Sequence, residues 1–153
     1  MHIISKHISY KEATRSNTAK RLGITNLPNR YQLSNMEVVA EAVFEPLRKW
    51  VGGPIRINSF FRCEDLNRAI GGSSRSQHCQ GRAMDLDDVH GHKTNAEMFR
   101  YIKENLNFDQ LIWEFGDEEN PDWIHVSYVS EDQNRKRCLK ALKFNGKTKY
   151  ELI

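Results

Sequence analysis

Apolar positions along the chain follow two spacings, one typical of helices and one typical of strands. A spacing of three to four residues predicts helices over 10–21, 34–51, 64–69 and 94–106. Alternation of apolar and polar residues predicts strands over 55–60, 82–87, 110–115 and 123–129, after a short apolar arm or edge strand at 3–9. Two β-rich runs around Asn145-Gly146 are typical of a hairpin.

Local signals give the expected boundaries of these elements. Ser9 is the expected N-cap of the first helix, and Gly23 is placed to end it. Pro46 interrupts the apolar period of the second helix and predicts a kink there. Residues 24–31 predict a loop. Because helices and strands are mixed and the later strands are joined by short turns, we expect an α+β fold with a largely antiparallel central sheet and flanking helices.

The composition fits one globular domain spanning residues 1–153, with 39% hydrophobic and 28% charged residues. No apolar run approaches the length of a transmembrane helix, and the first residues do not have the pattern of a secretory signal. The net charge of +3 is too small to indicate a nucleic-acid partner, and the basic run at 135–143 is typical of a solvent-exposed face. The three cysteines, Cys63, Cys79 and Cys138, are expected to be free thiols.

Two segments carry residues suited to binding a metal. His78 and Asp85 lie seven residues apart, with Gly81 between them where the chain can turn into the strand. His125 lies in a separate β-like run. Two imidazoles and one carboxylate form a typical catalytic zinc set, in which the fourth position is left for water.

Each of these residues also has an ordinary interpretation when taken alone. A lone histidine is more often a core or surface residue than a ligand, and an aspartate on a strand often caps a turn. His90-Gly-His92 is another potential metal-binding pair, although it lies in a polar loop. Spacing alone therefore leaves the site open.

The motifs in combination resemble a known family. SxHxxGxAxD at residues 76–85, followed by WIHVSY at 123–128, is similar to the zinc peptidases that include D-Ala-D-Ala carboxypeptidases, D-Ala-D-Ala dipeptidases and phage L-Ala-D-Glu endopeptidases. Their metal-binding core is shared with the hedgehog signalling domain. Further similarity lies in residues 59–67, in residues 70–78 and in two segments at 13–16 and 21–24, the last two resembling a phage- and prophage-associated branch. The resemblance covers roughly residues 9–129, with Phe60, Phe61 and Cys63 departing from the usual pattern.

This resemblance implies that His78, Asp85 and His125 bind one Zn²⁺. It places the general base three residues before the final histidine, at Asp122, with Glu114, Glu118 and Glu119 as rivals in the same hairpin.

The resemblance also implies a substrate arginine at Arg62, although an ion pair with Glu64 or Asp65 is an alternative. Ser76 and Gln77 match substrate-contacting positions, and Ser76 has the alternative role of capping its loop. Trp123 either lines the cleft or packs in the core. Cys79, beside a ligand, is expected to serve packing.

The implied activity is zinc-dependent hydrolysis of peptidoglycan stem peptides, as a D,D-carboxypeptidase or an endopeptidase. We expect a monomer without a nucleic-acid partner or membrane span, made in the cytoplasm and acting on the cell wall after release. The main alternative is a catalytically inactive zinc-containing cell-wall binding module of the same fold; a structural phage component is another. The bond that is cut is expected to depend on the loops at Gly71–Gln77 and Gly116–Pro121.

Overall fold

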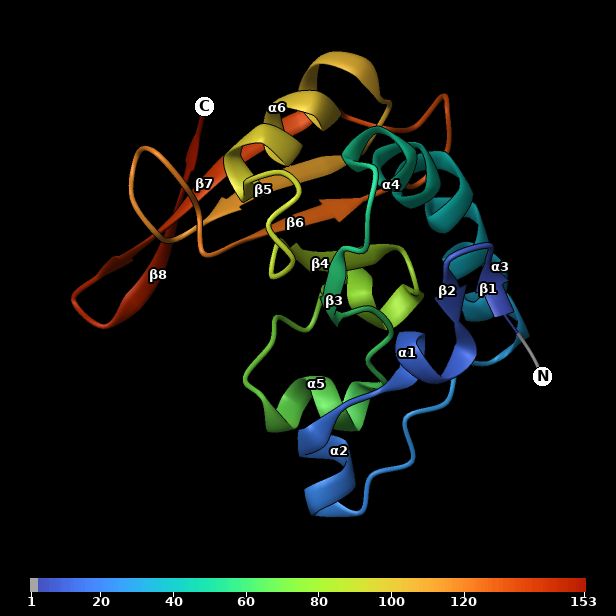
Figure 1. Ribbon diagram of the computed structural model, residues 1–153. Coiled ribbons are helices and arrows are strands. Elements are labelled where there is room, and N and C mark those ends of the chain that lie inside the picture. The colour runs from blue at the N-terminus through green and yellow to red at the C-terminus, as the bar shows by residue number, and fades with distance from the viewer. Residues whose placement is uncertain (1–2) are drawn as a thin grey trace.

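A six-stranded sheet forms the centre of the computed structural model, which describes residues 3–153 (Figure 1). Its spatial order is β3-β4-β6-β5-β7-β8. The strands are β3 (Arg56–Ser59), β4 (Ala83–Asp87), β5 (Gln110–Glu114), β6 (Trp123–Ser127), β7 (Arg137–Phe144) and β8 (Lys147–Leu152). All neighbouring pairs are antiparallel except β5 and β7, which run parallel. The prediction of an α+β fold with a largely antiparallel sheet is confirmed.

The C-terminal hairpin follows from its turn residues. Asn145 and Gly146 both have positive φ angles, of 50° and 74°, which match the twist of the two flanking strands. The hairpin of β7 and β8 extends the sheet beyond β5, and Figure 1 shows it projecting from the side of the molecule away from α4.

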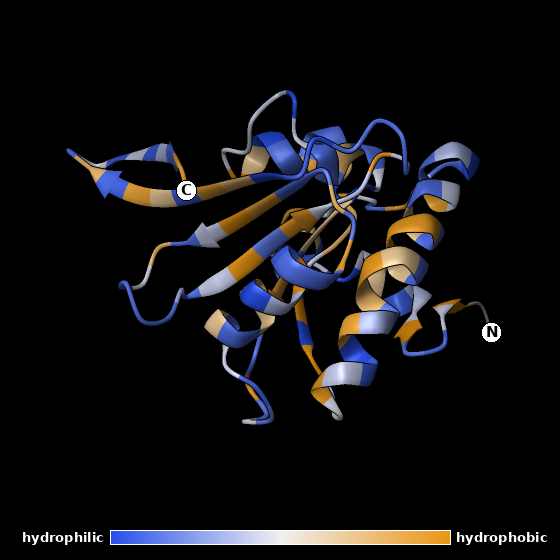
Figure 2. Ribbon diagram, turned by 90° about the horizontal axis from the view of Figure 1, so that it is seen from above, coloured by the Kyte–Doolittle hydropathy of each residue, from blue (hydrophilic) through white to orange (hydrophobic). Residues whose placement is uncertain are grey.

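Helices cover one face of the sheet and enclose the core. They are α3 (Arg30–Val39), α4 (Glu45–Val51) and α6 (Asn95–Asn105). Their apolar sides pack with strand residues in one cluster, in which Met36, Leu47 and Ile102 are fully buried. Figure 2 shows orange, hydrophobic segments alternating with blue ones along the long helical rod that contains α3 and α4. Each such side chain contributes about 1.5–3 kcal/mol on burial, so this face is the main source of stability.

The N-terminal part differs from the prediction in two places. The expected helix over 10–21 is two helices, α1 (Tyr10–Thr14) and α2 (Asn17–Leu22), because Ser16 starts a new helix by accepting the Ala19 amide. The second long helix begins at Arg30 and not at Ser34, since Asn29 and Gln32 form a capping box. Before α1 lies a two-stranded sheet of β1 (Ile3–Ser5) and β2 (Ile8–Ser9).

The proline in the second helix is accommodated by a change in helical winding. A π-helical turn, Ala40–Phe44, joins α3 to α4, and the Glu45 N–H donates to the Ala40 carbonyl five residues back. Pro46 has no N–H to donate and lies in the first turn of α4, directly after the π-helical turn. The wider turn lets one helical rod continue through the proline.

The other face of the sheet carries a second, smaller apolar cluster. Ile112, Leu139 and Ala141 form it, and the half-buried Phe115 packs against it. The remaining helix, α5 (Glu64–Ala69), and the 3₁₀ turn Gln77–Gln80 lie near the β3 end of the sheet. No helix within residues 3–153 combines the length and apolarity that a membrane crossing requires.

Candidate metal centre

The two strand-borne ligand candidates are brought together by strand register. Asp85 on β4 and His125 on β6 are direct cross-strand partners, so their side chains emerge side by side on the same face. The same lateral row continues to Ile112 on β5 and Leu139 on β7. His125 therefore points to the face of the sheet opposite the main core, because Ile124 and Val126 on either side point inward.

His78 reaches the same point from a short 3₁₀ turn beside the strands. Ser76 begins this turn by accepting a hydrogen bond from the His78 amide at 3.2 Å. Gly81 ends the turn with φ 76°, and a Cβ at this position would lie 2.4 Å from the Gln32 carbonyl oxygen. Only glycine fits both constraints, so it fixes the direction in which the chain enters β4.

Ligand atoms of His78, Asp85 and His125 lie within 4.8 Å of one another. The His125 Nδ1 is 3.0 Å from Asp85 Oδ1, and the His78 Nε2 is 3.3 Å from Asp85 Oδ2. The two imidazoles meet edge to face, with centroids 5.1 Å apart. This spacing is suited to one cation bound by all three side chains.

An unsatisfied nitrogen tests whether these residues fit a metal. His78 is buried, and its Nδ1 lies 2.8 Å from the Phe60 carbonyl oxygen, which can only accept, so Nδ1 carries the proton. Nε2 then presents a lone pair toward Asp85 and has no hydrogen-bond partner among the described residues. A metal-binding histidine typically has this arrangement: one ring nitrogen donates to a carbonyl or carboxylate, and the other is free to bind the metal.

Protonation states in this cluster also suit metal binding. Burial lowers the pKa of His78, which favours the neutral imidazole that a metal requires. Burial alone would raise the pKa of Asp85, but the interactions with His78 and the hydrogen bond from His125 outweigh it and hold this pKa well below its ordinary range. Asp85 is therefore an anionic carboxylate between two imidazoles, as a metal ligand would be.

The metal cleft, as we name the hollow of about 930 Å³ lined by these three residues, extends across the second face of the sheet. Its walls include Arg62, Gln77, Glu114 and Trp123. The side chain of Arg62 forms no ion pair with any described residue, whereas Asp65, one of its expected partners, pairs with Arg68. The Arg62 Nε is buried without a hydrogen-bond partner, and burial lowers the pKa of this side chain. A guanidinium held in this way is available to an anionic group in the cleft.

Of the carboxylates considered as the general base, Glu114 lies in the metal cleft. It ends β5 on the same face as His125 and is 8% exposed. Burial, reinforced by Asp85 and opposed by His125 and Arg62, raises the pKa of Glu114 to about 7. The expected base, Asp122, immediately precedes β6, is exposed and is not among the residues that line the cleft. Glu118 and Glu119 are also exposed and outside the cleft.

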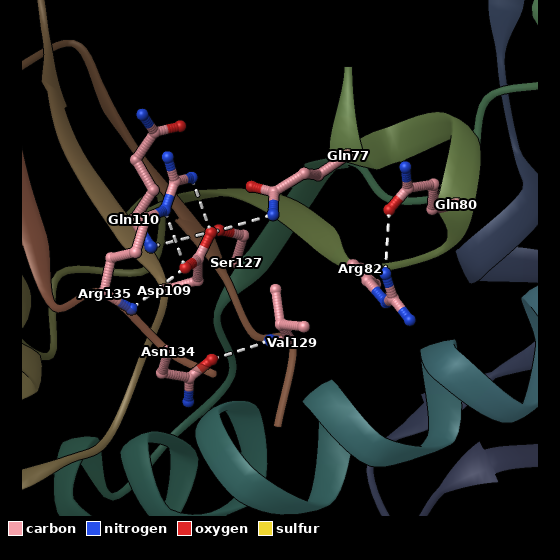
Figure 3. A network of polar contacts seen from close by, with 9 residues as sticks. All are labelled: Gln77, Gln80, Arg82, Asp109, Gln110, Ser127, Val129, Asn134 and Arg135. Carbon is pink, nitrogen blue, oxygen red and sulfur yellow. Dashed lines mark hydrogen bonds and ion pairs between the residues drawn. The ribbon is translucent and has the colours of Figure 1, made fainter. Parts of the chain in front are cut away.

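A buried aspartate holds the wall of the cleft together (Figure 3). The carboxylate of Asp109 accepts hydrogen bonds from Gln77 Nε2 at 2.9 Å and from the backbone and guanidinium of Arg135 at 2.8–3.0 Å. Its backbone N–H donates to the Ser127 carbonyl, and its carbonyl accepts from the Arg137 amide. Asp109 thus joins the His78 turn, β6 and β7, and the amide of Gln77, an expected substrate contact, is engaged in this network.

The other residues that the sequence analysis singled out differ in whether they line the metal cleft. Trp123 lines the cleft and packs edge to face against Phe115 at 5.5 Å, so it is a wall residue and not part of the main core. Ser76 lines the cleft but caps the His78 turn. His90 and His92 are exposed and take no part in the three-residue metal cluster. Cys79 is half-buried, and burial raises its pKa, consistent with packing.

A comparison with protein-family models decides the relationship of the chain. The model described as Peptidase M15 matches residues 6–127, well over half of the chain. The chain belongs to the peptidase M15 family. These are zinc-dependent metallopeptidases, so the His-Asp-His cluster of this M15 chain has the ligand set expected for its metal. A search of curated proteins gives no match.

One expectation from the sequence pattern of this M15 chain agrees with the structure and one does not. In the basic run at 135–143 the side chains of Arg135, Lys136, Arg137 and Lys143 are exposed as expected, while Cys138, Leu139 and Ala141 between them are buried, and Arg135, Arg137 and Lys143 also line the open metal cleft. The loop at Gly116–Pro121 was expected to shape the cleft but does not line it. Instead it packs beside α6, where Asn120 accepts the Ala96 amide.

Sequence reasoning missed Asp109 and Tyr150 as cleft-related residues. Tyr150 lines the cleft because its strand partner Ala141 is small and lies next to Glu114 in the same row. Period-two alternation along β7 and β8 could have placed Arg137 and Tyr150 on one face, but only the register of β5 against β7 brings that face to the metal cluster.

Proposed function

We propose that this M15 chain is a peptidoglycan peptidase that binds one Zn²⁺ and hydrolyses bonds of the cell-wall stem peptide. One observation carries the proposal: His78, Asp85 and His125 converge within 4.8 Å at the wall of an open cleft of about 930 Å³. A cleft of this size accommodates several residues of a peptide.

The metal, when bound, would polarise the scissile carbonyl and make water a stronger nucleophile at neutral pH. His78, Asp85 and His125 would hold it. The carbonyl of Phe60 keeps the proton on His78 Nδ1, so that Nε2 remains a ligand. Arg62, with a buried and unsatisfied Nε, is placed to stabilise negative charge that develops on the substrate or to bind a substrate carboxylate.

Glu114 is the side chain that we propose to carry the proton. Of the described residues, two carboxylates line the cleft, and the other one is Asp85, a proposed ligand. Glu114 lies on β5, the strand next to that of His125, and its side chain is on the same face of the sheet as His125. In this role Glu114 accepts a proton from the attacking water and returns it to the leaving amine. The sequence pattern pointed to Asp122, whose exposed position outside the cleft lining makes it the weaker candidate.

Paired variants separate the two carboxylates. Glu114→Gln preserves shape but cannot take a proton, so we expect kcat to fall by roughly 10²–10⁴-fold while bound zinc is retained. Asp122→Asn, which makes the same chemical change at the exposed site, is expected to stay within a few-fold of the parent. The measurements are steady-state kinetics on soluble muropeptides and zinc content by elemental analysis. If Asp122→Asn loses turnover and Glu114→Gln keeps it, the proton role belongs to Asp122.

A zinc-containing binding module without catalysis is the second candidate, and the position of Asp122 outside the cleft is the observation that favours it. Incubation of the zinc-loaded protein with purified peptidoglycan, followed by mass spectrometry of the released peptides, distinguishes the two. New peptide termini that disappear with a chelator and return with zinc support the peptidase. Retention of the protein on peptidoglycan without any product supports the binding module.

A further inference from the structure

The C-terminal hairpin builds one side of the metal cleft although it lies outside the family match, which ends at residue 127. Strand β7 pairs with β5 in parallel, so that Arg137 lies beside Gln110 and Leu139 beside Ile112. Because Ile112 is in turn the partner of His125, the side chains of Arg137 and Leu139 share the face of the metal ligands. The hairpin therefore enlarges the cleft along one direction, away from the metal and across the sheet.

The floor between the metal ligands and Arg137 is apolar. Ile112, Leu139 and Ala141 form it, and this cluster is separate from the main core. Strands lie about 4.8 Å apart and rise about 3.3 Å per residue, so the Cα of Arg137 is roughly 12 Å from that of His125. An extended peptide covers this distance in about three or four residues. A peptide cut at the metal would thus pass over the floor and bring a neighbouring residue to Arg137.

Cations dominate the charge of the cleft. Five basic residues line it, Arg62, Arg75, Arg135, Arg137 and Lys143, against two acidic ones, Asp85 and Glu114. Asp85 is held between two histidines, and the guanidinium of Arg135 is bound to Asp109. An unbalanced positive charge is thus left along the hairpin side of the cleft.

Among the cleft-lining cations at 135–143, Arg137 is the one whose side chain has no partner among the described residues. Its backbone is fixed, because its amide donates to the Asp109 carbonyl at 2.9 Å. Its exposed guanidinium, by contrast, makes no hydrogen bond or ion pair with any residue in the range 3–153 that the structure describes. Lys143 differs, since its ammonium lies over the Phe115 ring and 3.5 Å from Thr148 Oγ1. A guanidinium binds a carboxylate through paired hydrogen bonds, which a point charge cannot match.

We infer that the β7–β8 hairpin adds a carboxylate subsite to the metal cleft, with Arg137 as its specificity-determining residue. The ligand class is an acidic peptide whose free carboxylate lies about three to four residues from the bond that is cut. This inference rests on the proposed peptidase function and names the part of the stem peptide that the site selects.

Matched peptides test the subsite. The probes are a synthetic stem pentapeptide with free glutamyl and C-terminal carboxyls and two versions in which one of these carboxyls is amidated. The zinc-loaded parent protein is expected to prefer a free carboxyl over its amide by about tenfold in kcat/KM, mainly through KM, at one of the two positions. Arg137→Gln should remove this preference, and Arg137→Lys should restore only part of it.

The control is Arg56→Gln, the same change at an exposed arginine on β3 outside the cleft, which should leave the preference intact. Circular dichroism and zinc content verify that each variant is folded and loaded. Equal hydrolysis of acid and amide peptides by the parent protein, or a preference that survives in Arg137→Gln, overturns the subsite but leaves the peptidase function standing. Absence of hydrolysis of all peptides and of peptidoglycan overturns the peptidase function itself, and the subsite with it.

Discussion

Replacing Asp109 by asparagine tests how the cleft is held together. The carboxylate of Asp109 is buried and accepts four hydrogen bonds, one from Gln77 and three from Arg135. Asparagine has the same shape but only one acceptor oxygen, and its NH₂ group would face donors on the second side. The perturbation therefore removes a charge and sets donor against donor without opening a cavity.

The magnitude follows from the number and exposure of the partners. Hydrogen bonds to a charged group contribute about 1.5–3 kcal/mol each, and an unsatisfied buried donor costs about 1–3 kcal/mol. The side chain of Arg135 is 53% exposed, so water replaces part of what it loses. We therefore expect Asp109→Asn to lower the free energy of unfolding by about 2–3 kcal/mol, and Tm by roughly 4–12 °C.

The pH dependence of this difference has a defined sign. Burial raises the pKa of Asp109, but hydrogen bonds from Arg135 and Gln77 outweigh it, so the pKa in the folded state is below its ordinary value. The stabilisation is therefore present above the unfolded pKa of about 4 and is lost as pH falls through the folded value. The difference in the free energy of unfolding between the parent and Asp109→Asn should be largest near about pH 7 and become smaller in acid.

Urea denaturation at a series of pH values measures this difference in the free energy of unfolding, with Asp132→Asn as the control variant. Asp132 is exposed and lies outside the network, so its variant should remain within about 0.5 kcal/mol of the parent. A double-mutant cycle with Arg135→Gln isolates the pair. An Asp109→Asn protein as stable as the Asp132→Asn control near about pH 7, or a gap that does not change with pH, would refute the reasoning.

Two further variants test the metal centre. His125→Ala removes one of the three proposed ligands, so zinc affinity should fall by more than the roughly 10–100-fold typical of losing a supporting partner. His90→Ala should leave the affinity unchanged, and competition with a chromophoric chelator measures both. Gly81→Ala should destabilise the protein by more than Gly71→Ala in thermal unfolding. Both glycines have positive φ, but only the Gly81 Cβ would meet a neighbour, the Gln32 carbonyl oxygen at 2.4 Å. Equal effects of the two alanines would show that the close approach at Gly81 is relieved at no cost.

Most elements could be predicted because their signals are local. Thr94 and Glu97 form the capping box that starts α6, and Asn145-Gly146 makes the turn of the hairpin. Errors arose where a polar residue caps a helix at a position that the apolar spacing does not mark. Ser16 divides the first helix and Asn29 starts the next one earlier than its apolar period suggests. Ser16 acts through one side-chain hydrogen bond and Asn29 through the two of its capping box, and apolar spacing registers neither.

The candidate site was predictable only in part. The residues proposed as ligands could be named from motifs, because His78 and Asp85 flank one turn and His125 lies in a recognisable run. The carboxylate that lies in the cleft could not be chosen from among Asp122, Glu114 and their neighbours. That choice depends on which face of a strand each residue occupies, and a shift of one residue at the strand boundary reverses the answer.

The sequence by itself determined most helices and strands and the hairpin turn, because caps, turns and alternation act over a few residues, and its motifs named the candidate metal ligands. Only the tertiary structure decided which side chains share the metal cleft. The parallel pairing of β5 with β7 places Arg137 and Leu139 beside strands that precede them by more than twenty residues. Pairing over such separations is set by packing of the whole sheet against its helices, and no short pattern encodes it.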